Sequence, residues 1–185
     1  KETVKYIKSR HPVFETPVVL REDESIQSAL NLINKRAHGA IVVVDALNKP
    51  IGIFTEADAE GRDRFSNIGG VMTTDIISAD ESVTPRDAFN TLHKSRVSVL
   101  PIINKSGELL GVMTKKGAIR SEIYKPSLNK NGEFITAVAI GISNNFVKRA
   151  EELVEIGVDI IAMDTAHGHS KRMIDAVRTV RSAVG

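Results

Sequence analysis

The sequence predicts an α/β protein in which a strand-helix-strand-strand-helix unit occurs twice and is followed by two strand-helix units of a parallel sheet. Two segments, 29–58 and 88–117, align without a gap at an offset of 59 residues. The matching positions are Ala29 with Ala88, Gly52 with Gly111, and Thr55 with Thr114. A repeat of this length buries its apolar face best against a copy of itself. We therefore expect the two copies to pack face to face, with a small-ligand crevice between them.

The first copy is predicted to contain a strand at 18–20, a helix at 26–36 and two strands at 41–45 and 51–54. A short helix is expected to open at Thr55. Apolar residues in the predicted helix recur at spacings that place them on one face. The run I-V-V-V in the second strand is continuously apolar and β-branched, which is typical of a strand buried on both faces.

The second copy follows the same order, with strands expected at 76–77, 99–103 and 109–113. Thr84 and Pro85 mark the start of its helix, because proline suits the first helical position. Pro101 lies inside the middle strand. Since proline has no N–H to donate, it predicts an edge strand or an irregular ladder at this point.

After residue 124 the pattern changes to alternating strands and helices. We expect a loop at 126–132, strands at 135–140 and 159–163, a helix capped by Ser143 and Asn144, and a last helix through Val184. Wholly apolar strands in successive βα units predict a parallel sheet with its helices outside. Two such units cannot close the sheet alone, so further strands must come from elsewhere.

Composition excludes several classes of function. The 185 residues carry a net charge of only +2, with six Phe, two Tyr and no Trp, which argues against a nucleic-acid partner. No apolar run approaches the roughly 20 residues of a membrane span, and the N-terminus has no signal-peptide core. There is no cysteine, so disulfides, thiolate metal sites and a thiol nucleophile are excluded within these residues. We expect a cytoplasmic protein without a membrane partner.

The most informative motif is G-I-F-T-E-A-D at 52–58. Gly52 would let the backbone approach a ligand closely, and Thr55 would present its hydroxyl and nearby amides to a phosphate. Asp58, one turn later, could accept hydrogen bonds from a ribose diol. A structural interpretation stays open, because Thr-x-x-Asp is also a helix-capping pattern that is worth about 1 kcal/mol without any ligand.

The duplicated unit with its G-x-x-T-x-x-D motif resembles the cystathionine-β-synthase (CBS) domain pair, over about 12–123. The resemblance implies that ATP, AMP or GTP binds in the cleft as a regulatory ligand, with Gly52, Thr55 and Asp58 at an intact first site. In the second copy Gly117 stands where the CBS pattern has aspartate. That site is therefore expected to be altered, with Thr114 and Lys115 still able to attract phosphate.

The segment 164–170 is the other candidate site. Its His167-x-His169 spacing could suggest metal ligands, but no third ligand is near in the sequence, so no metal is expected. Asp164 follows a predicted buried strand, which is where α/β barrels place their chemistry. The alternative is a loop aspartate that satisfies backbone amides.

The runs at 138–142 and 152–170 are similar to the barrel segment that follows the inserted CBS pair in IMP dehydrogenases. The residues at 38–40, 56–58 and 63–65 more closely resemble an IMP dehydrogenase-related branch, whose members are thought to act as GMP reductases. The resemblance implies a tandem CBS domain pair plus two βα units of a partial TIM barrel, (β/α)₈. Its divisions would be a barrel-helix tail at 1–11, CBS domains at 12–70 and 71–124, and barrel at 125–185.

By the same resemblance, Asp164 and Thr165, with Ala166 beside them, would contact the nicotinamide ribose of NAD or NADP. The whole protein would oxidise IMP with NAD, or reduce GMP with NADPH through the same covalent intermediate on a cysteine. That cysteine belongs to a later barrel loop. The chain is therefore expected to be an inactive piece of a purine nucleotide oxidoreductase, which would form homo-oligomers through CBS-mediated dimers, as tetramers or octamers.

Two other classes of function stay open from the residues. One is a free-standing nucleotide sensor, and the other is a structural dimerisation module without a ligand. The apolar strands after residue 134 argue against a free sensor, since they require further strands to cover them. For the same reason the tail is expected either to pack against a second chain or to be poorly ordered.

Overall fold

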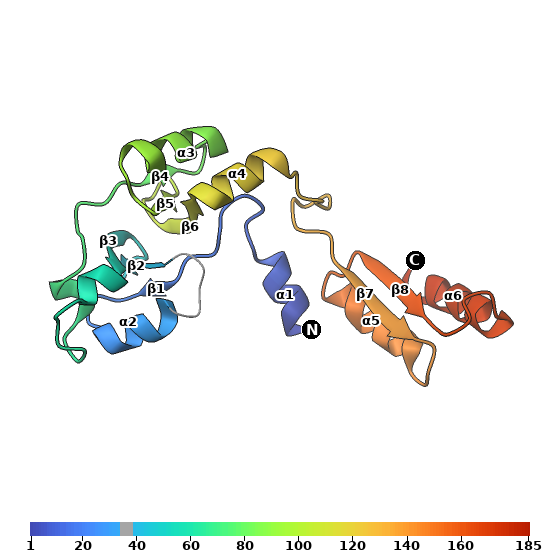
Figure 1. The fold of residues 1–185 in the computed structure, drawn as a ribbon. Coiled ribbons are helices and arrows are strands. Elements are labelled where there is room, and N and C mark those ends of the chain that lie inside the picture. Colours follow the sequence, from blue (N-terminus) through green and yellow to red (C-terminus); the bar gives the residue numbers. More distant parts are fainter. Residues whose placement is uncertain (34–38) are drawn as a thin grey trace. The chain divides into compact units, whose positions relative to one another are not determined.

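The structure is a computed structural model that describes residues 1–33 and 39–185 (Figure 1). It divides into two compact units. One, which we call unit 2, is continuous from Val13 to Lys125. The other, unit 1, is formed by Lys1–Pro12 together with Pro126–Gly185. Unit 2 is therefore inserted into the sequence of unit 1, and each is described below by itself.

The first repeat of unit 2 contains a three-stranded sheet in the order β1-β2-β3. Its elements are β1 (Val19–Leu20), α2 (Ile26–Ile33), β2 (Ala40–Val44), β3 (Pro50–Thr55) and two short 3₁₀ helices, η1 (Glu56–Ala59) and η2 (Ile68–Gly70). Strand β1 is parallel to β2, and β3 is antiparallel to it. All five residues of β2 are buried, as the apolar run predicts. The predicted end of the first helix, 34–36, lies outside the described residues.

The second repeat has the same topology, with a sheet in the order β4-β5-β6. Its elements are β4 (Ala79–Asp80), α3 (Pro85–Lys94), β5 (Val99–Ile103), β6 (Leu109–Thr114) and α4 (Lys115–Ile123). The register is conserved between the copies, because Ala40 pairs with Thr55 in the first and Val99 pairs with Thr114 in the second. Each repeat therefore delivers its motif threonine at the end of its last strand.

Two expectations for the second repeat need correction. Its first strand lies at Ala79–Asp80 and not at 76–77. Strand β5 is the central strand of its sheet, so Pro101 does not mark an edge. Pro101 faces Val112, whose N–H and C=O both bond to Glu15 on the opposite side. The missing proline donor is therefore not needed by β6. The ladder does shift after Ile102, but the first repeat shows the same shift without a proline.

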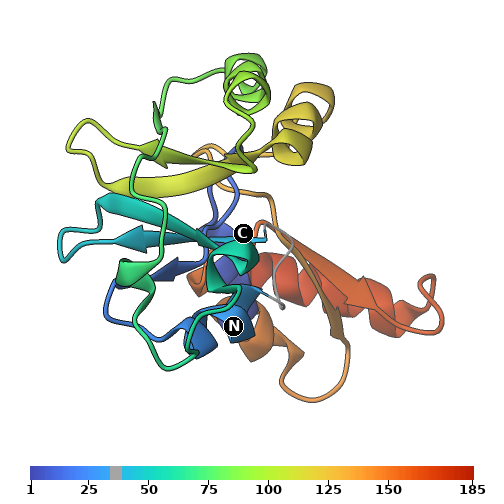
Figure 2. The same ribbon diagram turned by 60° about the vertical axis from the view of Figure 1, so that its left-hand side comes forward.

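The two repeats pack against each other through their sheets, and the helices lie outside (Figure 2). The apolar cluster between the sheets is formed by Ala40, Val42, Val44, Val99, Leu109 and Val112. A second cluster lies between α2 and the first sheet, and a third between the second sheet and its helices. Each sheet is thus covered on both faces, which explains its apolar sequence.

In each repeat the last strand also pairs with a short segment from elsewhere in the sequence. The segment before the first repeat pairs with the second repeat, and the segment before the second repeat pairs with the first. Glu15 exchanges two backbone hydrogen bonds with Val112 of β6, at 2.8 and 2.9 Å. Thr73 does the same with Ile53 of β3, at 2.9 Å in both directions. Phe14, beside Glu15, is buried in the core of the second repeat. The two repeats are therefore joined by a reciprocal exchange of segments.

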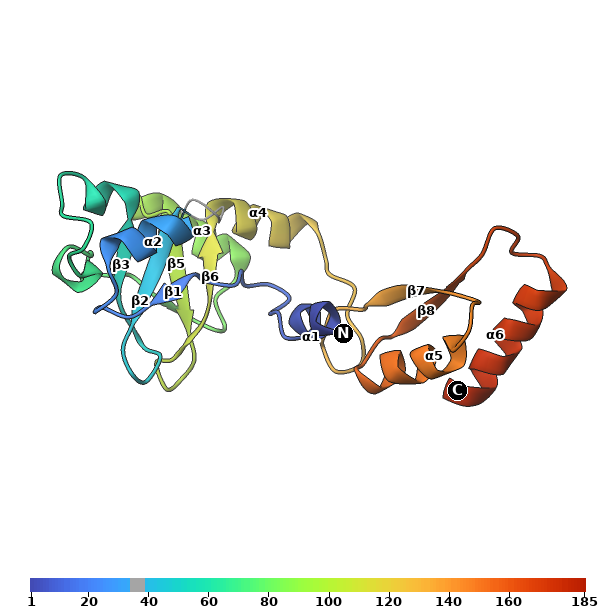
Figure 3. The ribbon, with the colours of Figure 1, turned by 90° about the horizontal axis from the view of Figure 1, so that it is seen from below.

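Unit 1 contains α1 (Glu2–Lys8), β7 (Ala137–Gly141), α5 (Phe146–Glu155), β8 (Ile160–Asp164) and α6 (Lys171–Val184). Strands β7 and β8 are parallel over their full length, as predicted. Helices α5 and α6 cover one face of this sheet (Figure 3), around a core of Ile140, Ala150 and Val180. On the other face the side chain of Ile160 is 52% exposed.

The predicted cap of α5 is wrong in its position. The helix begins after Asn145, which adopts a left-handed conformation at φ 67° and makes no side-chain capping bond. Among the described residues, no helix is long and apolar enough to cross a membrane.

A polar cluster joins the beginning of unit 1 to its later part. Lys8 Nζ lies 2.6 Å from Asp159 Oδ2, and the Lys8 side chain is only 7% exposed. The same carboxyl accepts hydrogen bonds from the Thr136 backbone N–H and from Asn129. The Lys8 ammonium, and then the Thr136 amide, hold the pKa of Asp159 well below its usual range. The carboxylate is thus kept charged at the point where α1, the 129–136 segment and β8 meet.

Candidate functional site

A hollow of about 220 Å³ lies between the two repeats of unit 2. It is lined by Ile53, Thr55, Thr73, Asp75, Ile76, Ile77, Arg96, Val97, Ser98 and Val99. The first repeat contributes the end of β3, the connector contributes 73–77, and the second repeat contributes the start of β5. The hollow is slightly smaller than the roughly 300 Å³ at the low end of ligand pockets. Its wall combines apolar side chains with a few polar ones, as small-ligand sites do.

Thr55, on this wall, forms a hydroxyl–carboxylate corner with Asp58, which does not itself line the hollow. The Thr55 backbone N–H and hydroxyl both donate to Asp58 Oδ2, at 2.7 and 2.8 Å. Both residues are half-buried, and Thr55 is the one that faces the hollow. The arrangement is a capping box on η1, and it also fixes a carboxylate and a hydroxyl in one place. The two interpretations of the motif are therefore physically compatible.

Gly52 lies behind this corner, and its missing side chain has a packing role. A β-carbon at Gly52 would clash with the sulfur of Met72. The space in front of this glycine is therefore occupied by Met72, which packs against the core of the first repeat. Met72, and not open space for a ligand, therefore lies against Gly52, unlike the close ligand approach that the sequence predicts there.

Four polar residues of the hollow lie outside the motif that the sequence singled out. They are Thr73, Asp75, Arg96 and Ser98. A guanidinium and a carboxylate in one cavity can recognise an anion and a hydroxyl-bearing group. Arg96 holds a positive φ of 56°, which is uncommon for a residue other than glycine. No local pattern in the sequence signals these residues, because only the packing of the repeats brings them together.

The second motif copy is placed at the N-terminus of α4. Thr114 is the helix cap, and its hydroxyl accepts the Gly117 backbone N–H at 2.9 Å. Lys115, the next residue, is half-buried. The Thr114 amide and hydroxyl both donate to Glu15 Oε2, at 3.2 and 2.7 Å. No motif in the sequence predicts a role for Glu15 at this place.

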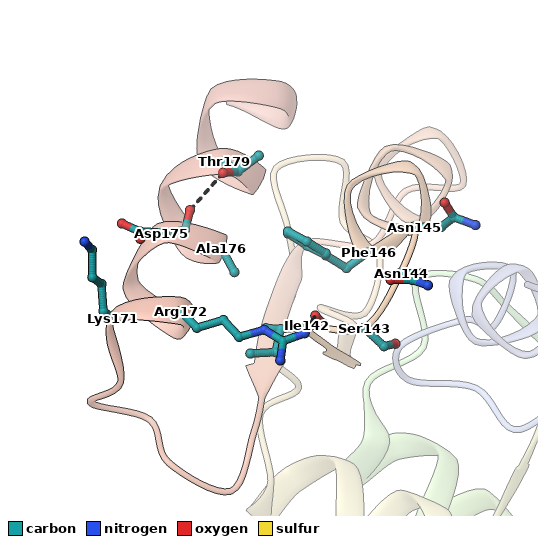
Figure 4. Close-up of a pocket in the computed structure, with 10 residues that line it drawn as sticks. All are labelled: Ile142, Ser143, Asn144, Asn145, Phe146, Lys171, Arg172, Asp175, Ala176 and Thr179. Atoms are coloured by element: carbon teal, nitrogen blue, oxygen red, sulfur yellow. Dashed lines mark hydrogen bonds between the residues drawn. The ribbon is translucent and has the colours of Figure 1, made fainter.

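In unit 1, Asp164 is the last residue of β8 and is exposed, with Thr165 and Ala166 directly after it. The structure thus keeps these three predicted residues together at the carboxyl end of the strand. A separate hollow of about 690 Å³ lies between α5 and α6 (Figure 4), and it does not include them. Arg172 reaches across this hollow and donates to the Ile142 carbonyl at 3.5 Å. No group of His, Asp and Glu side chains in the described ranges could hold a metal ion.

Comparison with known proteins gives one family for nearly the whole chain. Residues 2–185 match the IMP dehydrogenase / GMP reductase domain. The GMP reductase of Mycobacterium tuberculosis is 39% identical over 180 residues, which is 97% of this chain and 37% of that protein. The inosine-5'-monophosphate dehydrogenase of Nitrosopumilus maritimus is 34% identical over 183 residues, which is 98% of this chain and 38% of that protein. The chain thus spans well under half the length of these relatives.

Solved structures agree on the fold. GMP reductase from Trypanosoma brucei in complex with guanosine 5'-triphosphate has a TM-score of 0.72 at 25% identity. The match covers 97% of this chain and 45% of that one. A variant of the same enzyme in complex with guanosine 5'-monophosphate has a TM-score of 0.70 at 24% identity, covering 97% and 41%.

Proposed function

The chain belongs to the IMP dehydrogenase / GMP reductase family, and on that premise we propose that the protein containing it is an NAD(P)-dependent purine nucleotide oxidoreductase. The reductase direction, in which GMP, NADPH and protons give IMP, NADP and ammonium, is favoured by the higher identity to the mycobacterial GMP reductase. The dehydrogenase direction, in which IMP, NAD and water give XMP, NADH and a proton, is the alternative. The whole protein assayed with each pair of substrates decides between the two.

We further propose that unit 2 is a tandem CBS pair that binds a regulatory purine nucleotide between its repeats. The observation that carries this proposal is the hollow between the two repeats, with Thr55 on its wall and the Asp58 carboxylate bonded to the Thr55 hydroxyl. Thr55 would meet a phosphate, and Asp58 would accept hydrogen bonds from the ribose. A guanosine nucleotide is a reasonable first ligand, because the similar trypanosomal enzyme was solved with guanosine 5'-triphosphate.

The regulatory site is tested by titrating ATP, AMP and GTP while the melting temperature is followed. A nucleotide at about 100 times its Kd should add about 2.7 kcal/mol of stability. Calorimetry then counts the nucleotides bound per chain. Thr55→Val is expected to remove one of them, whereas Thr3→Val, at an exposed position of α1, should leave the count unchanged. If none of the three nucleotides shifts the melting temperature, the regulatory proposal fails.

For unit 1 we propose that β7-α5-β8-α6 is part of a (β/α)₈ barrel and that Asp164, with Thr165 and Ala166, binds the dinucleotide. The residues fit that group, because an exposed carboxylate at the end of a parallel strand can accept both hydroxyls of a ribose diol. The dinucleotide itself supplies or accepts the hydride. In the whole enzyme, Asp164→Asn should weaken dinucleotide binding, measured by quenching of NADPH fluorescence, about tenfold or more. Unchanged binding would remove this assignment.

A further inference from the structure

The two motif copies end in different residues, yet both threonines meet a carboxylate. In the first copy the Thr55 amide and hydroxyl donate to Asp58 Oδ2 at 2.7 and 2.8 Å. In the second copy the same two groups of Thr114 donate to Glu15 Oε2 at 3.2 and 2.7 Å. Glu15 is 99 residues away in the sequence. In both copies a threonine amide and hydroxyl therefore bind one carboxylate oxygen, although Gly117 itself carries no carboxylate.

The Glu15 carboxyl also occupies the space that a side chain at position 117 would need. A β-carbon built on Gly117 would lie 2.5 Å from Glu15 Oε2 and 2.8 Å from its Cδ. Both distances are shorter than any normal contact of a β-carbon. An aspartate at position 117 and the present position of Glu15 are thus mutually exclusive.

The main chain of Glu15 is fixed by its neighbours, and its carboxyl is held by the two Thr114 donors. Glu15 is paired with Val112 by two backbone hydrogen bonds, and the adjoining Phe14 is only 5% exposed in the core of the second repeat. Because Gly111 has no side chain, Phe14 can lie directly against β6. The acid is therefore delivered by a segment that is itself part of the second repeat's sheet and core.

We infer that Glu15 is the acid of the second corner, supplied from the segment before the first repeat, and that Gly117 is the residue that makes room for it. The ligand part of this inference rests on the proposed function of unit 2. A purine nucleotide at the second corner would meet Thr114 and Glu15 as it meets Thr55 and Asp58 at the first. Lys115 stands beside this corner and would face the phosphates.

A double-mutant cycle, measured as thermal stability without ligand, tests whether an acid at position 117 can replace Glu15. Glu15→Ala leaves the Thr114 donors without their acceptor and should lower the melting temperature by about 2–4 °C. Gly117→Asp should also lower it, since two carboxylates are forced into one place. The double variant Glu15→Ala/Gly117→Asp should melt above both single variants. If the two losses simply add, Glu15 and Gly117 are not a compensating pair and the inference is overturned.

A binding measurement tests the role toward a ligand, using calorimetry with GTP and ATP in a Thr55→Val background. The second corner should still bind one nucleotide per chain. Adding Glu15→Ala should weaken that binding at least tenfold, and Gly117→Asp in addition should restore most of it. If Thr55→Val already abolishes binding while wild type binds one nucleotide, Glu15 blocks the second corner and the inference fails. If wild type binds none, the proposed function fails, and the stability cycle still decides the Glu15–Gly117 pairing.

Discussion

Gly52 and Gly111 occupy equivalent places in the two motifs, but their neighbours differ in how far they can move. A β-carbon at Gly111 would lie 2.7 Å from the β-carbon of Phe14. That atom cannot retreat unless the backbone paired with Val112 moves as well. At Gly52 the obstacle is the flexible end of Met72, which can rotate away. Equal sequence positions therefore carry unequal packing constraints.

We predict that Gly111→Ala lowers the free energy of unfolding by about 1–3 kcal/mol, because overpacking forces the neighbouring backbone to shift. Gly52→Ala should be milder. Gly168→Ala is the control, since a β-carbon there meets no atom within 4 Å. Urea denaturation followed by far-UV circular dichroism measures all three. Equal losses at Gly52 and Gly111 would contradict the argument.

A second comparison separates the capping role of the motif from a binding role. Thr84 caps α3: its hydroxyl accepts the Asp87 backbone N–H and donates to the Asp87 carboxylate, away from the hollow. We predict that Asp58→Ala and Asp87→Ala each lose about 1 kcal/mol of stability, since each removes the carboxylate that accepts from a capping threonine. Only Asp58→Ala should also weaken binding of a purine nucleotide, measured by calorimetry. Normal nucleotide binding by Asp58→Ala would leave the motif with its capping role alone.

At the scale of residues, the sequence could point to what lies within one local motif. Thr55 and Asp58 are three positions apart, so their contact follows from the local turn. Arg96 and Thr73 reach the same hollow only because two sheets pack against each other. Glu15 depends on a pairing between segments 99 residues apart. Hydrophobic periodicity and motif spacing do not predict contacts between residues so far apart in the sequence.

At the scale of elements, the ion pair of Lys8 with Asp159 links α1 to the start of β8 across the inserted unit in the sequence. Lys8 sits at the end of its helix, where a cation is favoured by the helix dipole. The Asp159 carboxyl also accepts the Thr136 amide just before β7. Three elements of unit 1 thus share one buried contact.

This contact predicts a pH dependence. The native pKa of Asp159 is lowered, first by Lys8 and then by the Thr136 amide, whereas an unfolded aspartate titrates near about 3.9. Since the folded state holds the proton less tightly, the stabilisation is complete above about pH 4 and is lost as the pH falls further. Unit 1 should therefore become less stable as the solution is acidified below that point.

The matched variants are Lys8→Met and Lys1→Met. Lys8→Met should lower the melting temperature at pH 7 by about 2–4 °C and flatten the decline below pH 4. Lys1 pairs with Glu152 in an exposed position, so Lys1→Met should have little effect. Thermal melts from pH 7 to pH 2 measure both. An unaltered acid decline in Lys8→Met would show that other carboxyls cause it.

Among the elements, those with a strong local pattern were predicted well and those set by packing were not. The apolar strands of both repeats and the two parallel strands of unit 1 follow from their runs of branched residues. The first strand of the second repeat was misplaced, because Ile76 and Ile77 line the hollow and do not pair in the sheet. Apolar side chains alone do not distinguish these two surroundings.

At the scale of the whole molecule, the two units differ in how well their sheets are covered. The sheets of unit 2 have apolar clusters on both faces. Unit 1 has one small core and leaves Ile160, Val154 and Val177 more than 40% exposed. That this segment packs against a second chain or is poorly ordered stays a prediction, and the exposed apolar residues are its basis.

We predict that amides of β7 and β8 exchange with solvent faster than those of β2 and β5, because less apolar surface must open to expose them. Hydrogen exchange followed by mass spectrometry tests this in the 185-residue chain. Protection that rises with protein concentration would identify a second copy as the cover. Equal, strong protection of all four strands at low concentration would contradict the prediction.

The sequence predicted the duplication and the packing of the copies, since each repeat has one strand run too apolar to face water. It did not predict that the segment before each repeat pairs with a strand of the other repeat. That exchange is governed by backbone hydrogen bonds, which leave no pattern of side chains along the sequence. Its only trace in the sequence is the pair of glycines that leave space for Phe14 and Met72.

The exchange of segments has a consequence for synthesis on the ribosome. Glu15 emerges early, but the strand that receives it ends at Thr114, so its partner does not exist until 99 further residues have been translated. The first repeat receives its added segment sooner, because Thr73 follows Ile53 closely in the sequence. We expect the contact of Glu15 with the second repeat to form late in assembly, since contacts between distant parts of a chain form slowly.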